Sequence, residues 1–187
     1  MQHNKCCFCE KDQTDEYGAV EHFRPKKAFK RSENKQNEYP GYYWLINEWR
    51  NLYFVCSPCN TSKGAIFPLA NEKKRARNHH DDITLESPLI IEPTIDDPRD
   101  HIRFSKEEPK WRTRKGKRTI EVCSLDRDDL TDKRREVIRK LETWKLMISE
   151  FSHKLPPALL QKANKYLHDA VKPNAPFSSM ATDFINE

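Results

Sequence analysis

The sequence lacks any apolar run long enough to form a transmembrane helix, and its first residues lack the apolar core of a secretory signal peptide. It also contains no internal repeat and no low-complexity tract. These absences argue against an integral membrane protein, a secreted protein and a repeat architecture. We therefore expect a cytoplasmic protein with a globular fold.

Hydrophobic residues are scarce as well. They make up 36% of the 187 residues, whereas charged residues make up 34%. The hydrophobic core is therefore modest, and a bound metal ion would help to hold it together. The length suits one compact domain or a small module with an appendage. The formal net charge of +5 is compatible with a polyanionic partner but does not require one.

Four of the six cysteines form two pairs with the C-x-x-C spacing of a metal-binding knuckle. This spacing lets both thiols of a pair reach one tetrahedral Zn²⁺. Disulfides are the less favoured interpretation, because no secretion signal is present and the spacing occurs twice. The sequence therefore predicts a closed structural zinc site, in which Cys7 and Cys123 are expected not to take part. The expected zinc ligands are Cys6, Cys9, Cys56 and Cys59.

An acid–histidine pair, Glu21-His22, lies between the two cysteine pairs. Phosphodiester hydrolysis needs an activated water, neutralisation of the charge that builds up on the phosphate, and help for the leaving oxygen. His22 is suited to be the general base, because imidazole titrates near neutral pH. Mg²⁺, or Mn²⁺ in its place, prefers oxygen ligands, which Glu21 and the side-chain amide of Asn60 would supply. Adjacent residues of a regular strand face opposite sides, so we expect a twist or bulge at this pair.

Four motifs, in this order and spacing, resemble the zinc-bearing HNH endonucleases, which have the ββα-metal fold. The resemblance covers about residues 6–67. The motifs are Cys6-x-x-Cys9, Glu21-His22-x-x-Pro25, Asn51-Leu52 and Cys56-x-x-Cys59-Asn60-x-x-Lys63. A narrower resemblance, to the HNH nuclease subunits of Septu-type and retron-associated anti-phage systems, lies in Val20–Lys26, Tyr43–Leu45, Trp49–Leu52 and Pro88–Pro93.

The resemblance implies a metal-dependent endonuclease that hydrolyses phosphodiester bonds in nucleic acid. DNA is the expected substrate, and the chain would be the effector nuclease of an anti-phage defence complex with an ATPase subunit of the PtuA type. By the same resemblance, Asn51 ties a loop to the strands and orients His22, and Lys63 holds phosphate. The implied catalytic set is His22, Glu21, Asn51, Asn60 and Lys63, with Glu21 and Asn60 as ligands of a catalytic Mg²⁺.

Basic residues after His22 and near Trp111 are candidates for contacts with a nucleic-acid backbone. Similar charges are common in plain solvated loops and hairpins, so both interpretations stay open. The candidates are Arg24, Lys26, Lys63, Arg112, Arg114 and Lys115.

The expected fold is α+β: a small ββα-metal core held by the zinc site, then a linker with short strands, then a C-terminal helical extension. Apolar residues recur at helical period from Val137 to Phe151 and from Leu159 to Val171, which predicts a helical hairpin. The expected parts are 1–70, 71–124 and 125–187. We expect strands at 18–22, 51–56, 88–93 and 101–104, short helices at 42–49 and from Cys59 to about Gly64, a basic β-hairpin over 110–119 turning at Lys115-Gly116, and a loosely held tail over 174–187.

Two other functions compete with the nuclease. A four-cysteine zinc module without catalysis could bind nucleic acid or a protein, and it would need neither His22 nor Asn60. Alternatively, the chain could be an assembly or regulatory subunit whose helices matter most and whose nuclease is degenerate. The aromatic residues of 42–49 favour core packing over a base-stacking platform, and the helical stripes favour a hairpin core over docking on a partner.

Overall fold

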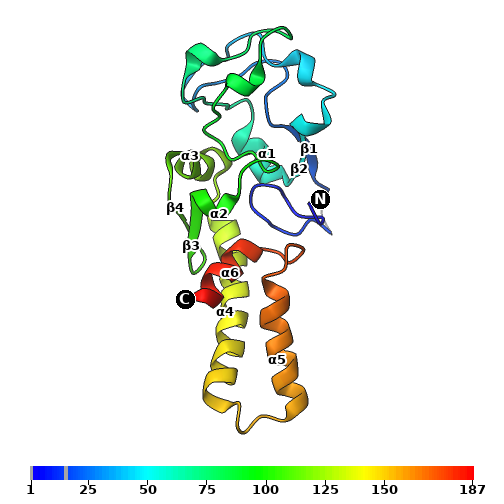
Figure 1. Ribbon diagram of the computed structural model, residues 1–187, viewed down its shortest axis with the longest axis vertical. Coiled ribbons are helices and arrows are strands. Elements are labelled where there is room, and N and C mark those ends of the chain that lie inside the picture. Colours follow the sequence, from blue (N-terminus) through cyan, green and yellow to red (C-terminus); the bar gives the residue numbers. More distant parts are fainter. Residues whose placement is uncertain (1, 15–16) are drawn as a thin grey trace.

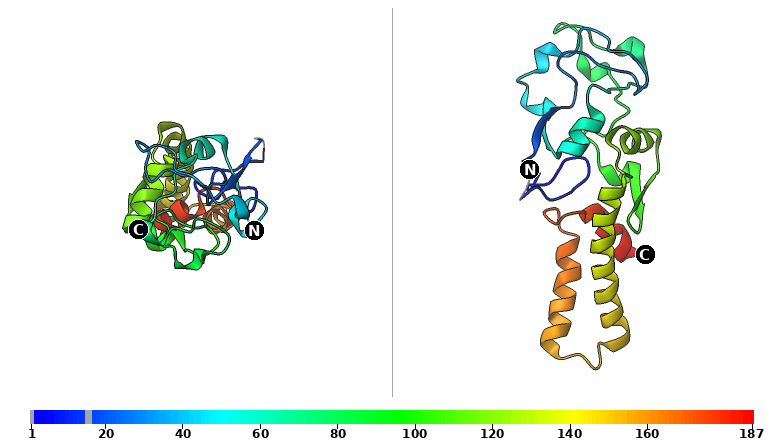
Figure 2. Two further views of the ribbon diagram at one scale, coloured as in Figure 1. Left: turned by 90° about the horizontal axis from the view of Figure 1, so that it is seen from above. Right: turned by 180° about the vertical axis from the view of Figure 1, so that it is seen from behind.

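Two separate pairs of antiparallel strands, each followed by a helix, lie at one end of a long helical hairpin (Figure 1). The computed structural model describes residues 2–14 and 17–187. The loops of the N-terminal half form the end opposite the hairpin, and the molecule is elongated as a result (Figures 1 and 2). The secondary structure is mixed α and β with two small sheets, as expected from the sequence.

The first strand pair and the helix after it form a β–β–α unit. Strand β1 (Ala19–His22) pairs antiparallel with β2 (Leu52–Val55), and helix α1 (Ser57–Lys63) follows directly. The expected strands and short helix are therefore confirmed. Gly64 ends α1 with a positive φ of 46°, a conformation that favours glycine, while its N–H donates to the carbonyl of Asn60.

Of the twist or bulge expected at Glu21-His22, the bulge is absent. The register of β1 against β2 runs from Ala19 opposite Val55 to His22 opposite Leu52 with no extra residue. Regular alternation therefore turns Glu21 to the buried side, whereas His22 lies half-exposed on the other side.

Short 3₁₀ turns and loops join β1 to β2 and α1 to the second strand pair. The helix expected over 42–49 is a 3₁₀ turn at Tyr43–Leu45 and a second one at Trp49–Asn51. Two more 3₁₀ turns follow at Glu72–Lys74 and Ile83–Leu85. The strand expected over 88–93 is also wrong, since only an isolated bridge between Leu69 and Pro88 forms there. Its apolar centre is nevertheless buried, at Ile90 and Ile91.

The second strand pair corrects the basic hairpin expected over 110–119. Helix α2 (Pro98–His101) leads into β3 (Ile102–Ser105), which pairs with β4 (Glu108–Trp111), so the turn lies at Lys106-Glu107. Helix α3 (Arg114–Cys123) contains the expected turn residues, and the Thr113 hydroxyl caps it by accepting from the N–H of Gly116 at 3.1 Å. A Cβ on Gly116 would lie 2.0 Å from the carbonyl oxygen of His101, so this glycine permits close packing rather than a turn.

Three helices complete the chain. Helices α4 (Asp128–Phe151) and α5 (Pro157–Ala170) lie side by side as the expected hairpin (Figures 1 and 2). The tail expected to be loosely held is instead helix α6 (Ser178–Asn186), which packs on β3 and α4. Met180 and Ala181 of α6 are fully buried, and the carboxylate of Asp183 accepts from the N–H of Phe104 at 2.7 Å.

The first and last parts of the described chain are joined by polar contacts. The ammonium group of Lys5 donates to the carbonyl of Ala175 at 2.9 Å and to the hydroxyl of Ser178 at 3.1 Å. Glu10 accepts from the hydroxyl of Ser178 and from the N–H of Ser179. Cys6 and Phe184 belong to the same cluster of buried apolar residues. The polar contacts therefore lie beside a core that the first and last parts of the chain share. The division into 1–70, 71–124 and 125–187 remains a prediction.

No helix among residues 2–14 and 17–187 combines the length and the apolar character that crossing a membrane requires.

Candidate active site and metal centre

Four thiols meet at the base of the β–β–α unit. Cys6 and Cys9 come from the N-terminal loop, Cys56 is the N-cap of α1, and Cys59 lies in the first turn of that helix. All four are buried, and their ligand atoms lie within 4.8 Å of one another. Four converging soft sulfur donors can hold a metal ion such as zinc. Within the described ranges, this is the one group of three or more Cys, His, Asp or Glu side chains placed to hold a metal.

The other two thiols lie outside the cluster. Burial raises the pKa of Cys7 and that of Cys123. Neither belongs to the group of converging ligand atoms, which consists of Cys6, Cys9, Cys56 and Cys59, in agreement with the sequence prediction.

Arg127 is a neighbour of the cluster that sequence reasoning missed. Its guanidinium donates to the sulfur of Cys59 at 3.5 Å and lies 3.8 Å from that of Cys56. The same group donates to the carbonyl of Ser124 at 3.0 Å and pairs with Asp129 at 3.0 Å. Four thiolates around a divalent ion carry two excess negative charges, which an adjacent guanidinium partly offsets. No local sequence signal marks this role, because Arg127 lies far along the chain from the cysteines.

His22 has one ring nitrogen fixed by the backbone. Its Nε2 lies 3.0 Å from the carbonyl oxygen of Ile46. A carbonyl oxygen can only accept, so Nε2 carries a proton, and the lone pair of the neutral ring then lies on Nδ1. This is the tautomer that a general base on Nδ1 requires.

Asn51 holds the segment that orients His22. Its buried side chain accepts from the N–H of Arg24 at 2.7 Å and donates to the carbonyls of Arg24 at 3.1 Å and Leu45 at 3.2 Å. Leu45 directly precedes Ile46, whose carbonyl binds His22. The geometry is therefore compatible with the positioning role expected for Asn51.

Lys63 does not face solvent, contrary to the expectation that it holds phosphate. Its side chain is fully buried, forms an ion pair with Glu21 and donates to the carbonyl of His22 at 3.1 Å. Lys63 thus fixes the end of β1 against α1 and directs the Glu21 carboxylate.

One cavity of about 430 Å³ brings together three of the expected catalytic residues. Glu21, His22 and Asn60 all line it, along with the exposed Lys26 and Lys27. A carboxylate and an amide carbonyl are oxygen donors of the kind that a hard divalent cation prefers, and one oxygen of Glu21 is already paired with Lys63.

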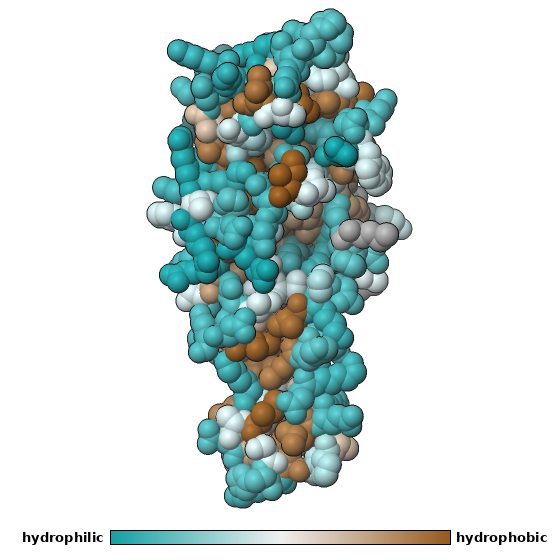
Figure 3. All heavy atoms as spheres, viewed as in Figure 1, coloured by the Kyte–Doolittle hydropathy of each residue, from teal (hydrophilic) through white to brown (hydrophobic). Residues whose placement is uncertain are grey.

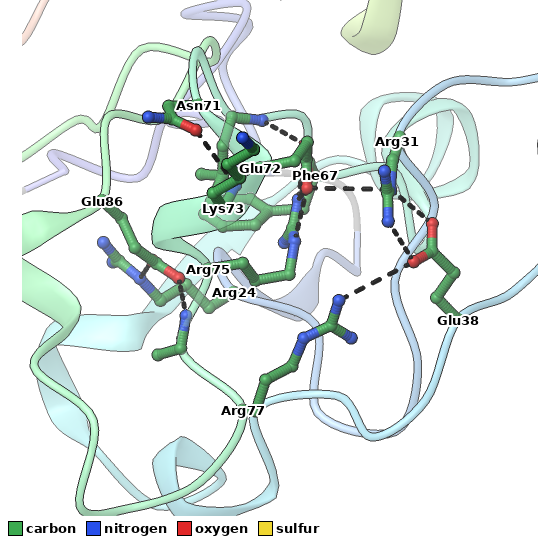
Figure 4. Close-up of polar contacts among 12 residues, drawn as sticks. Arg24, Arg31, Glu38, Phe67, Asn71, Glu72, Lys73, Arg75, Arg77 and Glu86 are labelled. Atoms are coloured by element: carbon green, nitrogen blue, oxygen red, sulfur yellow. Dashed lines mark hydrogen bonds and ion pairs between the residues drawn. The ribbon is translucent and has the colours of Figure 1, made fainter.

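The remaining candidates for nucleic-acid contact divide into engaged and exposed residues. Arg24 is buried and pairs with Glu86 at 2.9 Å (Figure 4). Lys115 pairs with Asp96 at 2.8 Å. By contrast, Lys26, Arg112 and Arg114 are exposed, but Arg112 and Arg114 lie beside the second strand pair and outside the cavity that His22 lines.

A buried ion network connects Arg24 with Arg75 through Glu86 and Tyr42, and no local sequence pattern indicates it. Arg75 is buried, pairs with Glu72 at 2.8 Å and donates to the carbonyl of Phe67 at 2.7 Å (Figure 4). It also donates to the hydroxyl of Tyr42 at 2.9 Å. Glu86 accepts from the hydroxyl of Tyr42 at 2.7 Å and thereby joins this network to the Arg24 pair.

No protein-family model matches the chain, and no solved structure matches it. The chain is 32% identical to Septu protein PtuB of Bacillus mycoides (strain KBAB4). The alignment is 215 residues long and covers 100% of this chain and 72% of that protein. It is 34% identical to Septu protein PtuB of Bacillus thuringiensis over 131 residues, 69% of this chain and 39% of that protein. Septu protein PtuA of Bacillus mycoides (strain KBAB4) is 25% identical over 71% of this chain and 19% of its own length.

The fold and the site thus define an α+β protein with a four-thiol metal-binding site. By its similarity over the full chain, it belongs to the PtuB family of Septu proteins.

Proposed function

We propose that the chain is a metal-dependent HNH endonuclease that hydrolyses phosphodiester bonds in nucleic acid, with DNA as the expected substrate. It acts as the effector nuclease of a Septu anti-phage defence complex. The observation that supports this most is the hydrogen bond from His22 to the Ile46 carbonyl. It leaves a basic nitrogen on a residue that lines one cavity with the oxygen donors Glu21 and Asn60.

Each residue then has a defined role. His22 takes a proton from the attacking water through Nδ1. The carbonyl of Ile46, in the loop that Asn51 holds, keeps the ring in place. Glu21 and Asn60 would hold Mg²⁺, which when bound supplies stabilisation of the charge on the phosphate and the leaving oxygen. Lys26, exposed in the cavity wall, contacts the backbone phosphates in place of the buried Lys63. Zinc in the four-thiol site stabilises the fold.

A plasmid-nicking assay with Mg²⁺ tests the catalytic role of His22. His22→Ala should lower the cleavage rate about 10² to 10⁴-fold, the usual loss for a general base, without changing metal content or melting temperature. His153→Ala, an exposed histidine after α4, is the matched control and should cleave as the wild type does. If His22→Ala and the control cleave equally with every divalent ion tried, the chain is a zinc-held binding module instead.

A metal-ligand role for Asn60 gives a second signature. Asn60→Ala should lose cleavage, and raised Mg²⁺ or Mn²⁺ should restore part of it, because one oxygen ligand is missing. His22→Ala should show no such rescue, since no metal ligand has been removed.

We further propose a PtuA-like ATPase as the protein partner, docked on the hairpin of α4 and α5. The matched segment of a PtuA protein and the membership of the PtuB family support this association. On the hairpin, Leu146 and Phe151 are exposed, and apolar side chains gather over its lower part (Figure 3). Copurification with a PtuA protein encoded nearby should fail for Leu146→Glu with Phe151→Glu, while Lys162→Glu, also exposed, should retain it.

A further inference from the structure

Four large apolar side chains near the candidate active site are exposed, and the side chains themselves take no part in the chemistry above. We call this set the platform and define it as Tyr39, Tyr43, Ile46 and Trp49. Their exposed fractions are 70%, 51%, 44% and 82%, respectively. Single exposed apolar residues are ordinary, but four large ones within residues 39–49 form a patch, and such patches commonly mark binding surfaces.

The platform residues are dispensable for packing. Tyr42, Leu45 and Asn51 already anchor this segment, because all three are buried. Tyr43 lies in the first 3₁₀ turn, Ile46 directly follows that turn and Trp49 begins the second one, and all three side chains are exposed. The buried residues therefore hold this segment, while these three side chains remain at the surface.

The platform is joined to the cavity at two points. The carbonyl of Ile46 accepts the hydrogen bond from His22 at 3.0 Å. Tyr39 lines the same cavity as His22 and Asn60. In β1, Val20 is also exposed and lies on the same side of the strand as His22, which extends the apolar surface.

Cations complete the surface. Lys26 and Lys27 are exposed and line the cavity beside Tyr39. Flat aromatic side chains next to lysines are the combination that binds single strands: bases stack on the rings, and ammonium groups follow the phosphates. In a paired duplex the base faces are covered by their neighbours and cannot stack on these rings.

We propose that the platform stacks unpaired bases, so that this chain binds single-stranded or locally unpaired nucleic acid across the His22 cavity. That unpaired nucleic acid is also the substrate that is cleaved rests on the proposed nuclease function, whereas the binding of unpaired bases does not. The complementary charge of Lys26 and Lys27 favours nucleic acid over a protein as the occupant of the platform.

Fluorescence anisotropy on the full chain tests the proposal. Binding is measured with the His22→Ala protein in the absence of divalent ions, so that no cleavage interferes. The probes are a labelled 20-nucleotide single strand of DNA, the same sequence as RNA, and the matching DNA duplex. Trp49→Ala should weaken binding of a single strand at least about fivefold, and Trp49→Phe should restore it, because a phenyl ring still stacks. Which single strand binds more tightly identifies DNA or RNA as the source of the bases.

Trp111→Ala is the matched control, an exposed tryptophan on β4 that does not line the cavity, and should bind as the parent does. Equal binding of duplex and single strand, no measurable binding to either, or an unchanged affinity in Trp49→Ala would each overturn the proposal. Loss of a copurifying PtuA protein in Trp49→Ala, with nucleic-acid affinity unchanged, would assign the platform to a protein partner instead. If Trp49 governs binding but the native chain never cleaves, the platform stands and the nuclease function fails.

Discussion

Replacement of Glu86 by Gln should destabilise the protein far more than any replacement of an exposed acid. The Glu86 side chain is completely buried and accepts from three donors: Nε of Arg24 at 2.9 Å, the hydroxyl of Tyr42 at 2.7 Å and the N–H of Ala76 at 3.0 Å. Glu86→Gln removes the negative charge and one acceptor oxygen, while the cation on Arg24 stays buried. Among the residues that the structure describes, Glu92 at 3.6 Å is the acid that remains to pair with it.

The expected magnitude follows from the burial. Breaking a buried pair while its partner stays behind costs about 3–5 kcal/mol, and the residual contact with Glu92 favours the lower value, about 3 kcal/mol. For a chain of this length, each kcal/mol shifts the melting temperature by about 2–4 °C, which predicts a fall of about 6–12 °C.

A thermal melt followed by circular dichroism measures this effect. Glu38→Gln is the matched control, because Glu38 also pairs with an arginine, Arg31, but both side chains are substantially exposed. Exposed pairs contribute about 0–1 kcal/mol, so the control should melt within a few degrees of the wild type. Equal shifts for the two variants would refute the reasoning that burial of the Arg24 cation decides the cost.

Three further predictions concern the metal centre and the ion network. Cys59→Ser should remove zinc, as measured by elemental analysis, and lower the melting temperature, whereas the near-isosteric Cys123→Ser should keep the metal. Arg127→Ala should release zinc to a chelator about 10 to 100-fold more readily, and unchanged release would contradict a role in metal retention. Burial raises the pKa of Glu92, so its contribution to stability is complete below about pH 4 and is lost as the pH rises through the raised pKa. The melting temperature of Glu92→Gln should therefore be higher than that of the wild type at pH 7.5, and the difference between the two should disappear near pH 4.

The sequence sufficed for features that depend on local spacing. The two C-x-x-C pairs predicted the four-thiol cluster, because this spacing lets both thiols of a pair reach one tetrahedral ion and it occurs twice. Strands β1 and β2 and the helical hairpin were likewise predicted from alternation and helical period.

Features set by tertiary contacts were not predictable in the same way. Lys63 and Arg24 look like free cations in the sequence, yet Glu21 and Glu86 neutralise them inside the fold. Gly116 resembles a turn glycine, but its lack of a side chain serves the approach of α3 to His101. In each case the deciding partner lies far along the chain, where no local pattern can indicate it.

The joining of the chain's first and last parts has a consequence for biosynthesis. The loop that carries Cys6 and Cys9 is held by Lys5 and Glu10, whose partners surround Ser178. During translation, that loop emerges from the ribosome long before Ser178 does. The loop with Cys6 and Cys9, which supplies half of the four thiols, therefore lacks these supporting contacts until almost all of the described chain has been made. We therefore expect a nascent or prematurely terminated chain to hold a metal at the four-thiol site more weakly than the full chain does, until synthesis has passed α6.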